Sequence, residues 1–223
     1  MEQNTQQKQR INLHNSVKEL SFQLWKTLLL CTLICVVVVI SLSGVMVNGL
    51  WGPLLTETIC LLLTGLTLYT QMWGAGDRDA NFIQFGRIER DPLKGLKIGL
   101  IVIIPSLLLN IPLALSMVEL IPIDLLPFYR ILQAPVWPLI NLIHPHGAVA
   151  HEATAAIEEL NITAMPATPG LGWGQFALLW LLPFIYTFFV VAGYELGIRR
   201  IELGFKLMYE DKKKKNARET GRK

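Results

Sequence analysis

Four long apolar segments dominate the sequence, and they leave few folds open to it. Each approaches the length of about 20 residues that an α-helix needs to cross the hydrocarbon core of a bilayer. Composition agrees, because 52% of the residues are hydrophobic and 17% are charged, whereas a soluble domain carries about a quarter charged residues. The chain is therefore predicted to be all-α, an integral membrane bundle of four transmembrane helices at about residues 28–47, 54–73, 93–120 and 174–198.

The orientation of the spans follows from a charged segment between the second and third apolar runs, residues 74–99. It contains five basic residues: Arg78, Arg87, Arg90, Lys94 and Lys97. Basic residues beside membrane spans stay on the cytoplasmic side, so this segment is predicted to face inward. With that choice, Arg130 is the single one of the 20 Lys and Arg residues on the outer side. The sequence predicts a multi-pass protein of the plasma (inner) membrane with both termini cytoplasmic.

Residues 1–26 are predicted to form a cytoplasmic N-terminal segment with one short amphipathic helix. Residues 16–19 have the pattern of a capping box. One helical face is shared by four apolar residues: Leu13, Val17, Leu20 and Leu24. Such a helix is typical of a segment that lies on the membrane surface before a span, and binding of a partner is the alternative. Trp25 and Lys26 are predicted to mark the water boundary. The long apolar run that follows argues against a cleavable signal peptide.

Two prolines interrupt the third span. Pro105 and Pro112 each remove a backbone N–H and clash with the preceding turn, so a kinked helix is predicted. The start of this helix is predicted at Asp91 and Pro92, where an acid that can cap the helix precedes a proline at the first helical position.

The outer loop, residues 121–173, contains a segment that is apolar but is not a simple span. Residues 122–138 read PIDLLPFYRILQAPVWP, in which Asp124, Arg130 and the repeated prolines are incompatible with a regular transmembrane helix. Irregular backbone is tolerated inside a membrane only against protein or water. The segment is therefore predicted to be partly embedded, as an interfacial or a re-entrant element.

The membrane domain, residues 27–198, is followed by a cytoplasmic basic tail, residues 199–223. Basic clusters next to a span bind anionic lipid on the cytoplasmic leaflet. The residues predicted to lie at the lipid surface are Arg199, Arg200, Lys212, Lys213, Lys214 and Lys215. Lipid and orientation account for these charges, so nucleic-acid binding is not predicted. Glu195, which closely precedes the two arginines, is predicted to form a local ion pair with them.

Ionisable residues within membrane spans are costly and often functional. Glu57 and Glu119 fall at similar depth near the outer ends of the second and third spans. Arg130 is the external basic residue that could pair with both. Together with Asn110 in the third span, these residues form the predicted ionisable membrane site, for a cation or a proton. A structural interfacial pair, or simply hydrated acids, is the alternative.

Three histidines and an acid cluster in the outer loop: His144, His146, His151 and Glu152. Neutral imidazoles and a carboxylate suit zinc or a similar ion. Their spacing does not match the helical H-E-x-x-H motif, so exposed loop histidines are the alternative to a metal site. All three cysteines lie inside apolar runs and are predicted to be small buried hydrophobes: Cys31, Cys35 and Cys60.

Glycines spaced four residues apart occur near the cytoplasmic ends of the last two spans. They are Gly95 and Gly99 in the third span, and Gly193 and Gly197 in the fourth. Small residues at this spacing let two helices approach closely. The four glycines are predicted to form one contact point between the third and fourth spans, and a chance pattern is the alternative.

Three stretches carry a resemblance to a known group of proteins. They read FGRIERDPLKGLKIG, FYRILQAPVWPLINLI and GYELGIRRIELGFKLMY, the last after a glycine-rich entry to the final span. With these stretches, the region from about residue 74 to 209 resembles small four-span membrane proteins of Gram-positive bacteria. The resemblance implies a bacterial plasma membrane, and it implies no mechanism.

Two classes of function fit these features. The first is a non-enzymatic accessory or scaffold subunit that acts through a membrane protein partner or as a homo-oligomer. The second is a small oligomeric transporter or channel, which would use the outer acidic site and the kinked third span. The chain lacks the G-x-S-x-G, P-loop and Rossmann patterns, so neither an enzyme nor a cofactor is predicted. A hydrated cavity that reaches Asn110 from one face would favour transport, and a dry bundle would favour the accessory role.

Overall fold

The computed structural model describes residues 16–46, 49–121, 123–150 and 167–201. Every element in these ranges is a helix. Four helical segments are long and apolar enough to cross a membrane: Val17–Ser41, Trp51–Gln84, Lys94–Met117 and Trp173–Ile198. The predicted class and number of apolar helices are thereby confirmed, but several of their bounds differ from the prediction.

The first long helix, α2 (Val17–Ser41), begins at a side-chain cap. The Ser16 hydroxyl accepts the backbone N–H of Glu19 at 3.3 Å, which confirms the predicted cap. The predicted short helix and the predicted first span form one continuous element, because no glycine or proline interrupts it. Leu20 and Leu24 are buried in the bundle rather than exposed at a membrane surface. Leu13 lies outside the described residues.

The second long helix, α4 (Trp51–Gln84), follows the short helix α3 (Ser43–Met46). It continues well beyond residue 73, where the sequence predicted its end. From the predicted end onward, the bundle-facing side of the helix continues from Met72 through three further buried residues: Ala75, Gly76 and Asp79. Their spacing keeps the helical period of 3.6 residues. The charged segment therefore begins as helix, and only residues 85–93 form the connection to the next element.

The third span is broken, as its prolines predicted. α5 (Lys94–Leu108) and α6 (Asn110–Met117) are separated at Leu109. The start of α5 is two residues later than predicted. Asp91 accepts the backbone N–H of Leu93 at 3.0 Å, so its carboxylate holds the turn that precedes the helix.

A tryptophan from α2 satisfies the backbone that Pro105 leaves open. Pro105 has no N–H, so the carbonyl of Ile101 lacks its usual helical donor. The indole Nε1 of Trp25 donates to the carbonyl oxygens of Ile101 and Val102, at 3.2 Å each. Trp25 therefore packs against α5, and the water boundary at Trp25 and Lys26 stays a prediction.

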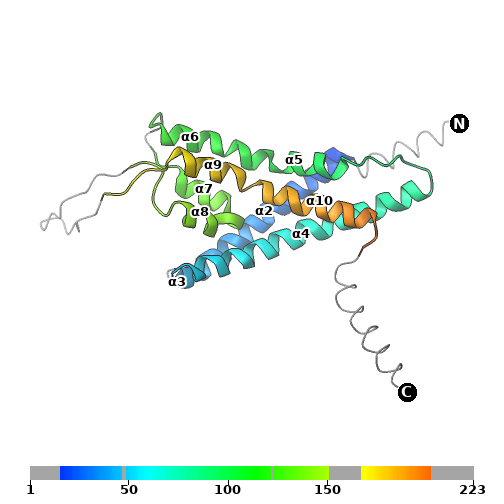
Figure 1. The fold of residues 1–223 in the computed structure, drawn as a ribbon, viewed down its shortest axis with the longest axis horizontal. Helices are drawn as coiled ribbons and strands as arrows, with labels where there is room; N and C mark the ends of the chain where they lie inside the picture. The colour runs from blue at the N-terminus through cyan, green and yellow to red at the C-terminus, as the bar shows by residue number, and fades with distance from the viewer. Residues whose placement is uncertain (1–15, 47–48, 122, 151–166, 202–223) are drawn as a thin grey trace, which may run out of the picture.

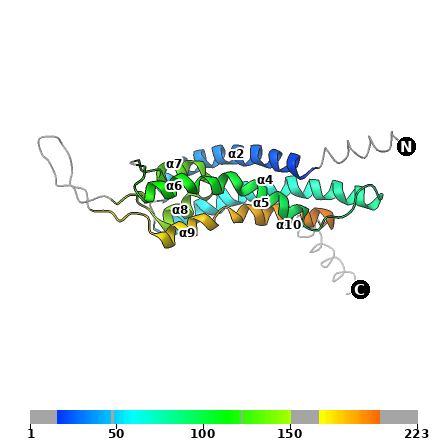
Figure 2. The ribbon, with the colours of Figure 1, turned by 90° about the horizontal axis from the view of Figure 1, so that it is seen from above.

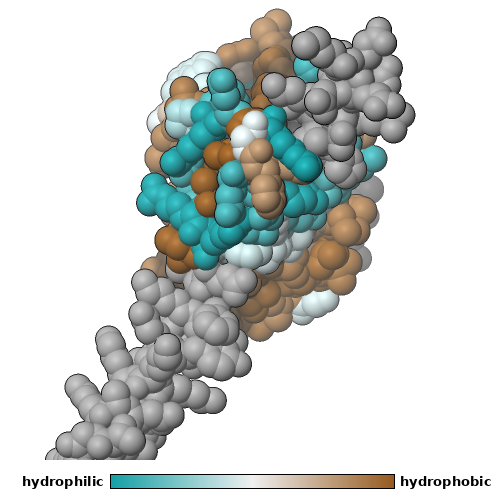
Figure 3. All heavy atoms as spheres, turned by 90° about the vertical axis from the view of Figure 1, so that its right-hand side faces the viewer, coloured by the Kyte–Doolittle hydropathy of each residue, from teal (hydrophilic) through white to brown (hydrophobic). Residues whose placement is uncertain are grey.

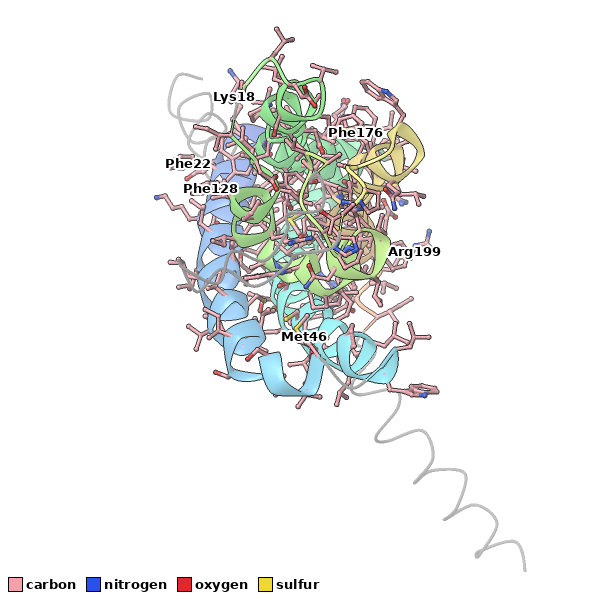
Figure 4. All side chains as sticks on the ribbon, turned by 90° about the vertical axis from the view of Figure 1, so that its left-hand side faces the viewer. Lys18, Phe22, Met46, Phe128, Phe176 and Arg199 are labelled. Atoms are coloured by element: carbon pink, nitrogen blue, oxygen red, sulfur yellow. The ribbon has the colours of Figure 1, made fainter. Side chains whose placement is uncertain are left out.

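After α6 the chain forms a helical hairpin from α7 (Leu126–Leu132), the 3-10 helix η1 (Ala134–Val136) and α8 (Trp137–Ile143). All three residues of η1 are buried, and η1 contacts both α2 and α4. Figure 4 shows Phe128 of α7 at the edge of this end of the molecule, on the same side as Phe22 of α2. The segment that was predicted to be no simple span is thus a hairpin whose turn is inserted between the long helices.

The final span is also in two parts, α9 (Trp173–Leu181) and α10 (Phe184–Ile198), on either side of Pro183. The most extensive contacts of α10 are with α4 and α5. The contacts between α4 and α5 are weaker than those that each makes with α10, so α10 joins the two helices.

The two ends of the bundle differ. The basic end carries Asp79, Lys94 and Glu195, and the capped end carries α3, α7 and α8. Figures 1 and 2 show α4, α5 and α10 side by side toward the basic end. Toward the capped end, α2 and α4 diverge from α6 and α9, and α7 and α8 lie between them (Figure 1). Hydrophilic residues cover the basic end, with hydrophobic flanks behind them (Figure 3).

Candidate functional site

The charge cluster at the basic end is built around one buried acid, Asp79 of α4. Its side chain is 1% exposed, and Oδ2 accepts hydrogen bonds from Lys94 Nζ at 2.6 Å and from the Tyr194 hydroxyl at 2.7 Å. A buried carboxylate is stable as an ion only when it is paired and hydrogen-bonded, and Asp79 is both. Three helices, α4, α5 and α10, thereby meet at one group. Sequence reasoning missed this cluster because it placed Asp79 in a loop.

The four predicted packing glycines form two contacts instead of one. The first joins α5 to α10, as predicted. A Cβ added at Gly99 would lie 2.8 Å from the Thr187 side chain, and a Cβ at Gly95 would lie 3.0 Å from the Tyr194 ring. The Thr187 hydroxyl also donates to the Gly99 carbonyl at 3.2 Å. These glycines therefore let α10 approach α5 closely.

The second contact joins α10 to α4, which corrects the prediction. A Cβ at Gly193 or Gly197 would clash with the backbone carbonyl oxygen of Tyr69 or Trp73, and a Cβ at Gly76 would clash with α10. Glycines four residues apart give a helix one flat face. The rotation of α10 about its axis turns that face toward α4, which the spacing in one helix does not reveal.

Glu195 of α10 forms the predicted local ion pair with Arg199, while Arg200 pairs with Asp77 instead. Glu195 Oε2 lies 3.9 Å from Arg199 Nη2, and it also lies 3.7 Å from Nη2 of Arg90, in the connection before α5. Both arginines are more than half exposed. Exposed pairs of this kind contribute little stability, so they orient the helix ends more than they hold them.

Arg200 binds protein groups although it was predicted to lie at the lipid surface. Its Nε lies 3.4 Å from Asp77 Oδ1, and its guanidinium donates to the side chain of Asn81. Both partners belong to the extension of α4, so Arg200 ties the end of the last span to that helix. The other lipid-surface residues of the tail lie outside the described part of the chain: Lys212, Lys213, Lys214 and Lys215.

At the capped end, Arg130 of α7 binds backbone carbonyls and not the predicted acids. Its Nη2 donates to the carbonyl oxygens of His144 and His146, at 2.8 Å each. No ion pair among the described residues joins Arg130 to Glu57 or Glu119, so the predicted shared pairing is wrong. The reason is local. The last carbonyls of a helix lack helical donors, and α8 ends beside Arg130.

Asp124 completes this network of backbone contacts. Its Oδ1 accepts the N–H of Leu126 at 2.9 Å and the N–H of Ala148 at 3.0 Å. Gln175 at the start of α9 donates to the carbonyl of Ile143 at 2.9 Å. The capped end is thus held together by side chains that satisfy exposed backbone groups, which is how irregular segments are stabilised.

The predicted histidine metal site finds no support in the described ranges, although two of its members lie outside them, His151 and Glu152. His144 is 2% exposed, and its Nε2 lies 2.7 Å from the Gly147 carbonyl oxygen. The rings of His144 and His146 are 5.9 Å apart. Within the described ranges, no group of three His, Cys, Asp or Glu side chains is arranged to hold a metal ion. The cysteines are buried and without disulfides, as predicted: Cys31, Cys35 and Cys60.

The remaining three residues of the predicted ionisable site differ in solvent exposure: Glu57 and Asn110 are buried, and Glu119 is exposed. Glu57 is 4% exposed. Its Oε2 accepts the N–H of Leu139 at 3.3 Å, while Oε1 is buried without a hydrogen-bond partner among the described residues. Asn110 is also buried and bonds through Nδ2 to the Ser106 carbonyl at 3.3 Å, and the same part of the chain offers no partner to its Oδ1. Glu119, in contrast, is exposed and has a left-handed φ of 57° just after α6. The structure therefore keeps Glu57 and Asn110 inside and Glu119 outside.

A cleft of about 320 Å³ opens on the flank between α2 and the break in the third span. Its lining includes Trp25, Leu29, Ser106, Leu132 and Gln133. Leu29 and Leu132 are 65% and 51% exposed, so the cleft opens sideways onto the apolar flank. Asn110 does not line it. The cleft is thus a lateral, largely apolar groove and not a hydrated path to Asn110.

No protein-family model matches the chain, and comparisons with curated proteins and with solved structures found no match. The resemblance to small four-span proteins of Gram-positive bacteria therefore stays a prediction.

Proposed function

We propose that this protein is a non-enzymatic accessory or scaffold subunit of the plasma membrane, which acts by contact with a partner inside the bilayer. The observation that carries the proposal is the closure of the bundle at its basic end. There α10 packs on α4 and α5 through glycines, and the Asp79 cluster joins the three helices. The lateral cleft, lined mostly by apolar side chains, also supports a role through surface contacts with a partner.

The helix α2 is the surface that a partner would cover. Only 22% of its most apolar stretch is buried, against 33–44% in the other three spans. Its exposed side carries large apolar residues over most of its length: Leu29, Leu30, Leu33, Val37 and Ile40. Helices in a membrane associate through van der Waals packing, and α2 has the most surface left for it.

Site-specific photo-crosslinking tests the partner. A photoreactive residue at Leu33, which is 66% exposed, is expected to give one discrete product in living cells. The control is Phe188 on α10, which is 69% exposed on another helix and is expected to give none. Two differently tagged copies of the chain show whether the product is a homo-oligomer. The absence of a product from both positions would contradict the proposal.

The basic end is proposed to face the cytoplasm, because basic residues beside spans stay inside. Cysteine labelling tests this orientation against a low background, since the native cysteines are buried. Thr168→Cys is expected to react with an impermeant thiol reagent from outside intact cells, and Glu89→Cys is expected to react only after the cells are opened. The reverse pattern would invert every span.

A second candidate, a small oligomeric transporter or channel, is favoured by the polar atoms buried near the capped end. Glu57 Oε1, Asn110 Oδ1 and the Tyr186 hydroxyl have no partner among the described residues, and such groups are costly in an apolar interior. Proteoliposomes decide between the two functions. Cation or proton flux that Glu57→Gln abolishes would establish transport, whereas the accessory role predicts no flux.

A further inference from the structure

We propose that a pocket between α2 and α4 at the basic end binds the headgroup of an anionic membrane lipid. The pocket has a volume of about 200 Å³. Its polar lining comes from Gln23 of α2 and from Thr70, Gln71 and Arg78 of α4. The proposal rests on the membrane setting argued above, with the basic end cytoplasmic, and it does not depend on the accessory role.

Arg78 supplies the positive charge. Its side chain is exposed, and no ion pair among the described residues involves it. The basic residues that are paired with acids at this end are Arg90, Lys94, Lys97, Arg199 and Arg200. Arg78 therefore differs from these neighbours in two respects, because it lines a pocket and has no ion pair with an acid in the described part of the chain. A guanidinium in that state is suited to bind a phosphate group through two parallel hydrogen bonds.

Two amides beside Arg78 can add neutral donors. Gln71 is held in place by Thr27, since its Nε2 donates to Thr27 Oγ1 at 2.8 Å and the Thr27 hydroxyl lies 3.0 Å from its Oε1. Nε2 carries a second N–H that this contact leaves available. Gln23 lies on α2 across the pocket and is exposed. The pocket thus combines one cation with side-chain N–H groups from both helices.

The space for a ligand exists because residue 74 has no side chain. Thr70, Gly74 and Arg78 follow one another at intervals of four residues, so they lie on neighbouring parts of one side of α4. A Cβ built at Gly74 meets nothing within 4 Å, unlike those at the packing glycines of the same helix bundle. Gly74 therefore leaves an open notch next to the guanidinium.

Apolar rows lead away from the pocket toward the capped end, which favours a lipid over a free anion. On α2, Leu30 and Ile34 lie seven and eleven residues after Gln23 and share its side of the helix; they are 59% and 41% exposed. On α4, Leu66 and Ile59 lie four and eleven residues before Thr70 and are 56% and 38% exposed. A phospholipid with its phosphate at Arg78 would lay its acyl chains along these rows.

Lipid binding by the purified full-length protein in neutral detergent tests the proposal. Native mass spectrometry is expected to show preferential retention of phosphatidylglycerol over phosphatidylcholine. Arg78→Gln is expected to weaken phosphatidylglycerol binding about tenfold, because charge-assisted hydrogen bonds are the strong ones. The control is Arg87→Gln, which removes the same charge at the same end but at a residue that stacks near Phe85, 6.0 Å from the ring, and does not line the pocket.

A second variant keeps the charge and fills the notch. Gly74→Leu is expected to lose the preference as Arg78→Gln does, and the open space around Gly74 lets the helix accept the new side chain. Equal loss in Arg78→Gln and Arg87→Gln, or no preference in the native protein, would overturn the proposal. Displacement of phosphatidylglycerol by inorganic phosphate alone would overturn the assignment to a lipid. Extraction of the variants from membranes by carbonate would instead show that the membrane setting has failed.

Discussion

The two halves of the bundle bury an acidic residue in opposite ways. At the basic end, Asp79 has a cation and a hydroxyl as partners, and glycines bring α10 against its neighbours. Near the capped end, Glu57, Asn110 and Tyr186 each keep one buried atom that has no hydrogen-bond partner in the described ranges, and a helical hairpin fills the space between diverging helices. One half is closed by direct packing of the spans, and the other is closed by an inserted segment.

This difference indicates where stability is concentrated and where change is tolerated. A buried, hydrogen-bonded ion pair holds the helices that supply it in one arrangement. Separating the partners or removing one leaves an uncompensated charge in the protein interior, which is costly. Unsatisfied buried atoms have no such partner to lose, and they are the atoms that call for a ligand or water. Substitutions are therefore expected to be more damaging at the basic end than near the capped end.

The largest effect is expected from Asp79→Leu. The variant leaves the Lys94 side chain, 14% exposed, without its counter-charge and Tyr194 without its acceptor. Breaking a buried pair in this way costs roughly 3–5 kcal/mol, which unfolding in detergent would measure. The double variant Asp79→Leu with Lys94→Met is expected to recover most of the loss. A single variant as stable as the native protein would show that the basic end is not held by this cluster.

Gly197→Ala is expected to have the next largest effect. Its Cβ would clash with the backbone carbonyl of Trp73, and the backbone yields less readily than a side chain. Overpacking of this kind costs about 1–3 kcal/mol. The control is Gly174→Ala in α9, whose Cβ meets nothing within 4 Å and which is expected to be neutral or slightly stabilising. Equal melting temperatures for the two variants would contradict close packing at the basic end.

Trp25→Phe tests the contact between α2 and the middle of the bundle. The variant loses the donor to the Ile101 and Val102 carbonyls, and a hydrogen bond of this type contributes about 0.5–1.5 kcal/mol. In a Pro105→Ala background, residue 105 regains its own N–H and can bond Ile101 itself. The cost of Trp25→Phe is therefore expected to shrink there, and a double-mutant cycle measures the coupling. If Trp25→Phe costs the same stability in both backgrounds, the indole does not compensate for the N–H that Pro105 lacks.

Glu57→Gln tests whether the buried acid near the capped end contributes as much stability as Asp79 does at the basic end. The amide oxygen can accept the Leu139 N–H as the carboxylate does, and no counter-charge is lost. The stability is expected to change by roughly 0.5 kcal/mol or less, since the hydrogen bond from the Leu139 N–H is kept. A loss as large as that of Asp79→Leu would mean that both halves are held by their acids.

Acidification is expected to have the smallest effect, at the exposed turn before α5. Lys97 Nζ, 2.7 Å from Asp91, and the Leu93 N–H hold the pKa of Asp91 below its ordinary value. The contact therefore adds stability above the unfolded pKa of Asp91, and this contribution is lost as the pH falls through the folded pKa. Because the pair is exposed, the contribution is small. The native protein and Asp91→Asn are expected to differ in unfolding near neutral pH and to converge in acid.

The parts of the fold that depend on neighbouring residues could be predicted. The cap at Ser16 requires only a hydroxyl three residues before Glu19, and the break in the third span follows from prolines that remove backbone donors. The apolar length of each span is likewise visible in one segment at a time. Such features are decided within a few turns of helix, so the structure agrees with them.

The parts of the fold and of the site that depend on residues far apart in the sequence could not be predicted. The burial of Asp79 requires Lys94 and Tyr194 from two other helices, although the spacing of Met72, Ala75, Gly76 and Asp79 already signalled that the helix continues. Arg130 was predicted to need an acid, yet its partners are carbonyls, which every residue carries and no sequence pattern marks. The direction in which the glycines of α10 face is set by helix rotation, which is a property of the assembled bundle.

The position of α10 between α4 and α5 has a consequence for biosynthesis. This helix is the last of the four spans to leave the ribosome, yet it makes the close contacts on both sides of the basic end. The hairpin of α7, η1 and α8 is translated before it and packs against α2 and α4, which are translated first. A nascent chain can therefore complete the capped end while the basic end is still open. A chain that stops before Phe184 would keep three apolar spans for insertion and would lack the helix that closes them.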